Sequence, residues 1–253
     1  MAASRLPGKP LSDIGGVPMI VRVWRRAVAA DLGPVVVAAG EGEIVAAVEA
    51  AGGRAVLTNP GLPSGSDRIW AALAEVDPDG RHDVVVNLQG DLPALDPAQL
   101  QLVAGALAES GADVATLAAP IDNDADRTNP AVVKAIVAWD SDERLGKALY
   151  FTRAPAPTGD GPLWHHVGLY AYTRAALERF VALPPSPLER REKLEQLRAL
   201  EAGMTIAVAR VDEPPLSVDT PEDLERARRL SDGQRGGESR AASPARPNKR
   251  DIS

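Results

Sequence analysis

From Gly33 to about residue 120, expected strands alternate with expected helices, and this alternation limits the fold more than any other feature. The expected strands read GPVVVAA, RAVLT, HDVVVNLQGD and ADVATLAAPI, and they are almost continuously apolar. Helical stretches lie between them, and one of these has Asp96 as N-cap and Pro97 at its first position. Apolar strands that are each followed by a helix are typical of a parallel sheet covered on both faces.

The second half of the chain combines its elements less regularly. Strands are expected at PAVVKAIVAW, ALYFTRA, HHVGLYAYT and MTIAVARV, and helices at 174–182 and 187–202. A closing helix begins at TPEDLERARRL, where Thr220 is the expected cap and Asp223 completes a capping box. Residues 231–253 are poor in apolar side chains and rich in Gly, Ser, Pro and Arg, so we expect a disordered tail there.

The composition excludes several classes of protein. The formal net charge of −7 gives no general attraction to nucleic acid or to an anionic membrane surface. Because the chain of 253 residues has no cysteine, it forms no disulfide and no cysteine-ligated metal site. No apolar run approaches about 18 residues, and the first residues lack the apolar core of a signal peptide. We therefore expect a cytoplasmic protein that binds neither nucleic acid nor membrane.

A basic turn, SRLPGKP, places Arg5 and Lys9 four residues apart around a Pro-Gly pair. Gly8 allows the backbone to approach a ligand closely, and the two cations can face one anion such as a nucleoside triphosphate. The spacing is not that of the P-loop, and a solvated basic turn is the plainer interpretation of this stretch alone.

Two carboxylates are candidate metal ligands. Asp91 follows the strongest expected strand, in NLQGD, where open α/β sheets bind ligands, and its oxygens suit Mg²⁺. Asp219, in SVDTPEDL, is a candidate second ligand, although such a sequence also starts a helix without any further role. An ordinary turn accounts equally well for Asp91 taken by itself.

Further polar residues lie at the ends of expected elements. In SGSDR, free backbone N–H groups at a helix start can hold an anion, or Ser66 is simply an N-cap. Arg153 follows an aromatic and aliphatic strand, and His166 and Tyr170 point to the same face of another strand. The structural alternatives are a surface arginine, a hydrogen-bonded histidine and a core tyrosine.

Taken in chain order, these stretches resemble the 3-deoxy-manno-octulosonate (Kdo) cytidylyltransferases, the CMP-Kdo synthetases of lipopolysaccharide-making bacteria. The resemblance runs from Ala2 to about Leu230. It is carried by RLPGKPL, SGSDR, VNLQGDLP, LYFTRA, HHVGLYAY, PSPLE, EKLEQLR and VDTPEDL.

The resemblance implies transfer of CMP from CTP to the 2-hydroxyl of Kdo, with release of pyrophosphate. It implies that Arg5 and Lys9 hold the triphosphate, and that Asp91 and Asp219 hold Mg²⁺, these four being the catalytic residues. The nucleotide pocket it implies also contains Ser64, Gly65, Ser66 and Arg68. The sugar site it implies contains Gln89, Arg153, His166, Tyr170, Glu195 and Gln196.

The resemblance also implies an architecture. We expect a three-layer α/β nucleotide-diphospho-sugar transferase fold with a mainly parallel central sheet. Residues 1–230 form the cytidylyltransferase domain, in which about 1–120 bind the nucleotide and about 121–230 bind the sugar and form a homodimer. Members usually carry a strand like VIPAR before such a basic turn, so we expect this chain to lack the first, central strand.

Two alternatives to a Kdo enzyme stay open from the sequence. One is a cytidylyltransferase for another acidic sugar such as sialate. The other is an N-terminally truncated, inactive homologue that binds a nucleotide without transferring it.

Overall fold

The computed structural model describes residue 6 and residues 8–241. The strands are β1 (Asp13–Ile14), β2 (Val17–Pro18), β3 (Val36–Ala39), β4 (Arg54–Leu57), β5 (Val84–Asn87), β6 (Val114–Pro120), β7 (Lys134–Trp139), β8 (Leu145–Thr152), β9 (Trp164–Thr173) and β10 (Ile206–Arg210). The helices are η1 (Lys9–Leu11), α1 (Met19–Ala29), α2 (Gly42–Ala50), α3 (Gly65–Val76), α4 (Pro97–Ser110), α5 (Asp124–Thr128), α6 (Arg174–Ala182), α7 (Pro187–Glu192), α8 (Gln196–Glu201) and α9 (Pro221–Ala241).

The largest sheet is mixed, so the prediction of a mainly parallel sheet is wrong for it. Its six strands lie in the order β5-β9-β6-β10-β8-β7, and only β6 and β10 pair in parallel. β7 is followed by β8, and β8 by β9, without a helix between them. Because parallel neighbours need a long crossover connection, β7 pairs antiparallel with β8, and it also pairs antiparallel with β9.

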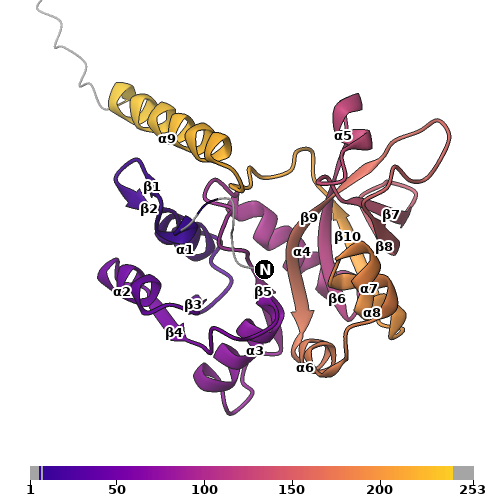
Figure 1. The fold of residues 1–253 in the computed structure, drawn as a ribbon, viewed down its shortest axis with the longest axis horizontal. Coiled ribbons are helices and arrows are strands. Elements are labelled where there is room, and N and C mark those ends of the chain that lie inside the picture. The colour runs from indigo at the N-terminus through magenta and orange to yellow at the C-terminus, as the bar shows by residue number, and fades with distance from the viewer. Residues whose placement is uncertain (1–5, 7, 242–253) are drawn as a thin grey trace, which may run out of the picture.

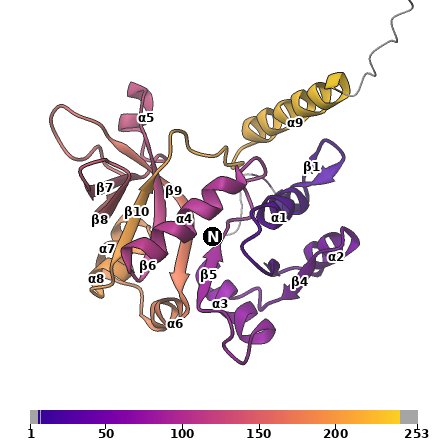
Figure 2. The same cartoon turned by 180° about the vertical axis from the view of Figure 1, so that it is seen from behind.

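Both faces of this sheet are covered, which confirms the expected three layers. Along β6, Leu117 packs into the core beneath α4, whereas Ala118 packs into the core beneath α6 and α8. On β10, Ala207 and Val208 alternate between the same two cores. Figure 1 shows α7 and α8 in front of the sheet, and Figure 2 shows α4 on its other face.

The N-terminal part has a smaller sheet of its own. β3 and β4 pair in parallel, and α1 and α2 cover them through a cluster that includes Ile20, Val21, Ile44 and Val48. Among the described residues, β3 pairs only with β4, and β5 pairs only with β9. Each of these two apolar strands therefore has one edge without a hydrogen-bonded neighbour in that part of the chain.

The helix predicted over 187–202 is interrupted. α7 begins with a capping box between Ser186 and Glu189, and it ends at Lys193, whose φ of 57° is left-handed. The carbonyls of Glu192 and Lys193 accept hydrogen bonds from the guanidinium of Arg153. In a continuous helix, these two carbonyls would accept the N–H groups of the next turn. They contact Arg153 instead, and the second helix, α8, starts at Gln196.

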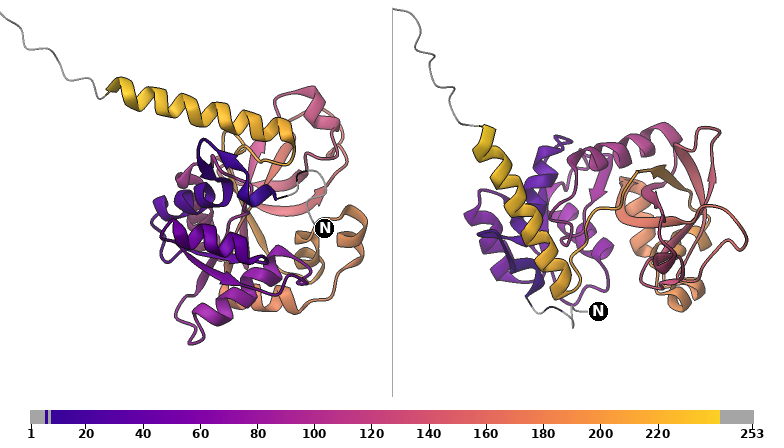
Figure 3. Two further views of the ribbon diagram at one scale, coloured as in Figure 1. Left: turned by 60° about the vertical axis from the view of Figure 1, so that its left-hand side comes forward. Right: turned by 90° about the horizontal axis from the view of Figure 1, so that it is seen from above.

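The closing helix is longer than predicted. α9 follows the Thr220 cap and continues to Ala241. The hydroxyl of Thr220 accepts the N–H of Asp223, and the carboxylate of Asp223 accepts the N–H of Thr220. The expected disordered tail over 231–253 stays a prediction, because the helix extends to 241 and residues 242–253 lie outside the described residues. Figure 3 shows α9 running beside the N-terminal part, where Arg228 donates to the carbonyl of Asp13. None of the helices in the described part is both long and apolar enough to span a bilayer.

Candidate active site

Three segments that are far apart in the sequence meet at Lys9. Its Nζ lies 3.0 Å from Asp91 Oδ2 and 3.0 Å from Asp219 Oδ1. Lys9 opens η1 directly after Gly8, whose φ of 67° is left-handed. Asp91 follows β5, and Asp219 immediately precedes the Thr220 cap of α9. The structure thus brings together three of the four residues predicted to be catalytic; the fourth, Arg5, lies outside the described residues.

Backbone contacts hold the two carboxylates in place independently of Lys9. The N–H of Val218 donates to the carbonyl of Asp91 over 2.9 Å, which ties the segment before α9 to the end of β5. The N–H of Asp219 donates to Asp223 Oδ2 over 3.1 Å, and Ser217 donates to Asp219 Oδ2. The carboxylates are therefore held near each other by the fold.

Lys9 is held as a cation between these carboxylates. Burial alone would lower the pKa of its ammonium, but the charges and hydrogen bonds of Asp91 and Asp219 outweigh burial and raise that pKa. The side chain of Lys9 is only 16% exposed, whereas that of Asp219 is 61% exposed. One wall of the site is thus open to solvent, on the side of Asp219.

The oxygens around Lys9 suit a divalent cation that also binds a substrate. Within residues 6 and 8–241, no group of three or more His, Cys, Asp or Glu side chains gathers as a metal site. Mg²⁺ is commonly held by one or two carboxylates and by substrate phosphates, so Asp91 and Asp219 are a sufficient protein contribution. The ammonium between them shows that this position accepts a positive charge.

The start of α3 forms a second part of the site. Ser64 is its N-cap and accepts from the N–H of Asp67 over 3.2 Å, so the cap is Ser64 rather than Ser66. Ser66 is buried and directs its hydroxyl toward Glu195 Oε2, 3.5 Å away. This contact links the predicted nucleotide pocket to the predicted sugar site.

Arg68 joins α3 to the ends of the small sheet. Its Nη1 donates to Thr58 Oγ1 over 2.6 Å and approaches the carbonyl of Asn59. A Cβ at Gly40 would lie 2.9 Å from the same nitrogen, so only glycine leaves room for the guanidinium there. Arg68 therefore holds together the loops that follow β3 and β4.

Gln89 lies where the two predicted sites meet. Its amide nitrogen donates to Asn87 Oδ1 over 3.1 Å, at the end of β5. A Cβ at Gly65 would lie 3.5 Å from the same nitrogen, which places Gln89 against the start of α3. A residue predicted for the sugar site thus contacts one predicted for the nucleotide pocket.

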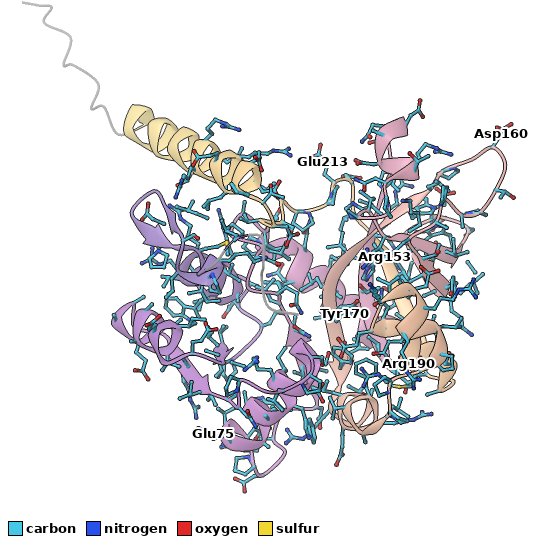
Figure 4. All side chains as sticks on the ribbon, in the orientation of Figure 1. Glu75, Arg153, Asp160, Tyr170, Arg190 and Glu213 are labelled. Atoms are coloured by element: carbon cyan, nitrogen blue, oxygen red, sulfur yellow. The ribbon has the colours of Figure 1, made fainter. Side chains whose placement is uncertain are left out.

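Arg153 is fixed by backbone carbonyls. It donates to Glu192 O over 2.8 Å, to Pro130 O over 2.9 Å and to Lys193 O over 3.4 Å. The Glu192 carboxylate accepts the N–H of Arg153 and the hydroxyl of Thr152. A guanidinium has five N–H donors, so these three contacts leave two for a ligand. Figure 4 labels Arg153 and Tyr170 on the half of the molecule that the six-stranded sheet occupies.

His166 and Tyr170 share one face of β9, as the sequence predicts. Their ring centroids are 5.5 Å apart, and the His166 ring also contacts Phe151 at 4.8 Å. Burial, reinforced by the charge of His165, lowers the pKa of His166 to about 3, so its imidazole is neutral near pH 7. Burial likewise raises the pKa of Tyr170, which keeps its hydroxyl protonated.

Thr116 was not predicted to have a role, and the structure places it beside His166. Its Oγ1 lies 3.1 Å from His166 Nε2 and also bonds the carbonyls of Val167 and Leu169, where the β6–β9 pairing shifts register. The only available signal was one hydroxyl residue inside an otherwise apolar strand.

Two neighbouring residues at the start of α8 carry buried polar atoms without a hydrogen bond. These atoms are Glu195 Oε1 and Gln196 Nε2, although Arg198 Nη2 lies 3.6 Å from the former. Burial raises the pKa of Glu195. Glu195 and Gln196 thus carry a buried acceptor and a buried donor without a hydrogen bond, which is rare because buried polar atoms are nearly always hydrogen-bonded.

Comparisons with known proteins show the family to which the chain belongs. A family model described as cytidylyltransferase matches residues 1–206. The 3-deoxy-manno-octulosonate cytidylyltransferase of Parvibaculum lavamentivorans is 66% identical over 228 residues, which cover 90% of this chain and 88% of the relative. The chain belongs to the 3-deoxy-manno-octulosonate cytidylyltransferase family.

Other members and structures of nucleotidyltransferases support the same assignment. The family member of Rhodospirillum centenum is 64% identical over 247 residues, covering 98% of this chain and 94% of the relative. A solved structure of CMP:2-keto-3-deoxy-manno-octonic acid synthetase complexed with CTP superposes with a TM-score of 0.84 at 37% identity. The superposed region covers 92% of this chain and 95% of the chain in the solved structure. A nucleotidyl transferase of Methanothermobacter, at 16% identity and a TM-score of 0.56, shares the fold alone.

Proposed function

We propose that this chain transfers CMP from CTP to the 2-hydroxyl of Kdo and releases pyrophosphate, as a step of lipopolysaccharide synthesis. The observation that carries the proposal is the meeting of Lys9, Asp91 and Asp219, with Nζ 3.0 Å from each carboxylate. A cation and two carboxylates at the end of a central strand suit a nucleoside triphosphate and its metal. The names of close relatives point to CTP and Kdo as the substrates.

In the proposed reaction, the sugar oxygen forms a bond to the α-phosphorus while the bond to the β-phosphate breaks. The hydroxyl proton leaves to solvent, and pyrophosphate carries away the negative charge. Arg5 and Lys9 bind the triphosphate and offset the charge that develops on the leaving group. Asp91 and Asp219 would hold Mg²⁺, which would supply further charge neutralisation and would lower the pKa of the attacking hydroxyl. The remaining acceleration comes from holding the two substrates in line.

The sugar is proposed to bind between β9 and the start of α8. Glu195 and Gln196 offer the unsatisfied acceptor and donor described above, which suit sugar hydroxyls. Arg153 suits the carboxylate of an acidic sugar, because its two remaining N–H donors and its charge can bind two oxygens together. Residues up to about 120 hold the nucleotide in this proposal, and later residues hold the sugar.

Arg153→Lys is expected to raise KM for Kdo by about tenfold or more, while KM for CTP stays within about twofold. The guanidinium of Arg153 has enough donors to bind three carbonyls and a ligand carboxylate together. The ammonium of a lysine at this position has only three donors and cannot bind all of them at once. Steady-state kinetics with each substrate varied in turn measures both constants. Arg190→Lys, on the neighbouring helix α7, is the matched control, and equal rises in both KM values would contradict the role of Arg153.

Pyrophosphate release by the purified protein tests the proposed function. We expect release with CTP, Mg²⁺ and Kdo, and little release when UTP replaces CTP or sialate replaces Kdo. Preference for sialate would move the assignment to another acidic-sugar cytidylyltransferase. Binding of CTP without any release, in a protein shown to be folded, would favour the inactive nucleotide-binding alternative.

We also propose that a further strand belongs between β3 and β5. Val84 of β5 is 47% exposed although its strand is apolar, and both strands lack a neighbour on one edge within the described residues. Unpaired edges leave N–H and C=O groups open to another strand. An added N-terminal apolar strand of about five residues should slow amide exchange in Val36–Ala39 and Val84–Asn87. A polar extension of equal length is the control, and unchanged exchange would contradict the proposal.

A homodimer that forms through the second half of the chain is proposed as the working state, in the cytoplasm where CTP is available. Leu149 of β8 is 56% exposed, so its apolar side chain is available for a contact with a second chain. Light scattering should give twice the chain mass for the wild type and the monomer mass for Leu149→Lys. Val28→Lys, at an exposed apolar residue of the first half, should remain dimeric.

A further inference from the structure

We propose that Lys9 acts as a replaceable cation. In the nucleotide-free protein its ammonium occupies the position between Asp91 and Asp219, and a divalent cation takes that position only when Lys9 leaves. The free protein then binds divalent cations weakly, and the nucleotide and the cation enter together. This inference rests on the proposed function, since it needs a triphosphate that draws Lys9 away.

The carboxylate pair exists before any metal binds. Val218 N–H donates to the carbonyl of Asp91, and Asp223 Oδ2 accepts the N–H of Asp219, so neither backbone depends on Lys9. Two like charges held near each other by the backbone repel unless a positive charge lies between them. Nζ of Lys9 meets this requirement with two equal contacts of 3.0 Å.

Lys9 and a divalent cation exclude each other at this position. Both would have to contact Asp91 Oδ2 and Asp219 Oδ1, and two cations a few ångströms apart repel strongly in a partly buried site. Lys9 is able to move because its ammonium is carried on a flexible four-carbon stem. The phosphates of a triphosphate offer Lys9 a stronger set of acceptors, which frees both carboxylates.

This exchange couples the two ligands. A nucleotide that removes Lys9 from the carboxylates raises their affinity for the divalent cation, and the cation raises the affinity for the nucleotide by the same factor. Without the nucleotide, the cation must displace the ammonium on its own. The state with metal but without nucleotide is therefore sparsely populated.

Binding of Mn²⁺ to the full chain without nucleotide tests the exchange. Electron paramagnetic resonance measures free Mn²⁺, which here stands in for Mg²⁺. We expect Lys9→Met to bind Mn²⁺ at least about tenfold more tightly than the wild type, because the competing ammonium is gone. Lys147→Met, at an exposed position of β8, is the matched control and should match the wild type.

A double variant assigns any gain to this carboxylate pair. Lys9→Met combined with Asp219→Asn should lose the tighter Mn²⁺ binding. Equal binding by Lys9→Met and the wild type would overturn the proposal, and so would a gain that survives in the double variant. Circular dichroism of each variant confirms that it is folded before its binding is compared.

The chemical reactivity of Lys9 in the unaltered chain is a second test of the exchange. Acetylation of Lys9 by acetic anhydride, followed by mass spectrometry, should rise severalfold once Mn²⁺ is raised to a concentration at which electron paramagnetic resonance shows it bound to the wild type, because the bound cation displaces the ammonium. Unchanged reactivity of Lys9, with Lys147 as internal reference, would overturn the exchange. Since pyrophosphate release is assayed separately, failure of the exchange and failure of the proposed function are distinguishable.

Discussion

Asp91→Asn is expected to lower kcat/KM for pyrophosphate release at least about 100-fold, which is the upper end of the losses seen when groups supporting a metal are removed. The amide has the shape of the carboxylate but lacks its charge. It therefore weakens the proposed metal site and the contact with Lys9 without creating a cavity. Continuous detection of pyrophosphate, with CTP and Kdo each varied, measures the loss.

The same change should leave the fold almost intact, which separates a catalytic role from a structural one. An asparagine oxygen can still accept from Lys9 Nζ, and Asp219 still neutralises the ammonium, so the substitution leaves no unpaired buried charge. The backbone bond from Val218 to the carbonyl of residue 91 is unaffected by the substitution. Thermal unfolding of the variant should stay close to that of the wild type.

Asp96→Asn is the matched control in the same loop region. Asp96 caps α4 by accepting the N–H of Ala98, and asparagine is as good an N-cap as aspartate. This variant should keep full activity and stability. If Asp91→Asn retains wild-type activity, Asp91 holds no metal and the proposed site is wrong.

Local signals in the sequence predicted single elements well. The helix expected over 174–182 is α6, because Thr173 accepts the N–H of Ala176 and starts it. The cap at Asp96 and Pro97 and the shared face of His166 and Tyr170 are also confirmed. Caps and strand periodicity act over a few residues, so the sequence shows them directly.

Features that depend on distant contacts were not predictable in the same way. No glycine or proline marks the break at Lys193, which coincides with carbonyl contacts from Arg153, 40 residues away. β7 pairs antiparallel with β8 and with β9 across connections without helices, which apolar strand patterns do not reveal. Asp219 was a candidate second ligand beside Asp91 from the residues, but only the family resemblance favoured that role over a plain helix start, because their spacing in the sequence carries no signal.

His166 is expected to make folding stability strongly dependent on pH. Its pKa is about 3 in the folded protein, mainly because burial disfavours the charged ring, against about 6.5 in an unfolded chain. Below pH 6.5 the unfolded state binds a proton that the folded state does not bind, so stability falls as pH falls. The full stability is present above about pH 6.5, and the loss continues down to about pH 3.

The loss is about 1.4 kcal/mol per pH unit, so it reaches roughly 2 kcal/mol between pH 6.5 and pH 5. This is a large share of the roughly 5–15 kcal/mol by which a domain is stable. Urea unfolding at a series of pH values in this window measures it. The pKa of Asp77 is lowered to about 2, chiefly by the backbone N–H of Arg81. The contribution of Asp77 to folding stability is therefore lost only below the range of pH 6.5 to pH 5.

His166→Gln should flatten this dependence, because glutamine does not titrate and its amide can still donate to Thr116. The pKa of His165 is also lowered by burial, so the wild type has a further slope of the same sign. Subtracting the slope of His166→Gln from that of the wild type removes this contribution and isolates His166. His82→Gln, at an exposed histidine, should keep the wild-type slope. If His166→Gln also keeps the wild-type slope, the imidazole is charged or solvated in the folded protein. The description of His166 as a buried, neutral ring beside Thr116 would then be wrong.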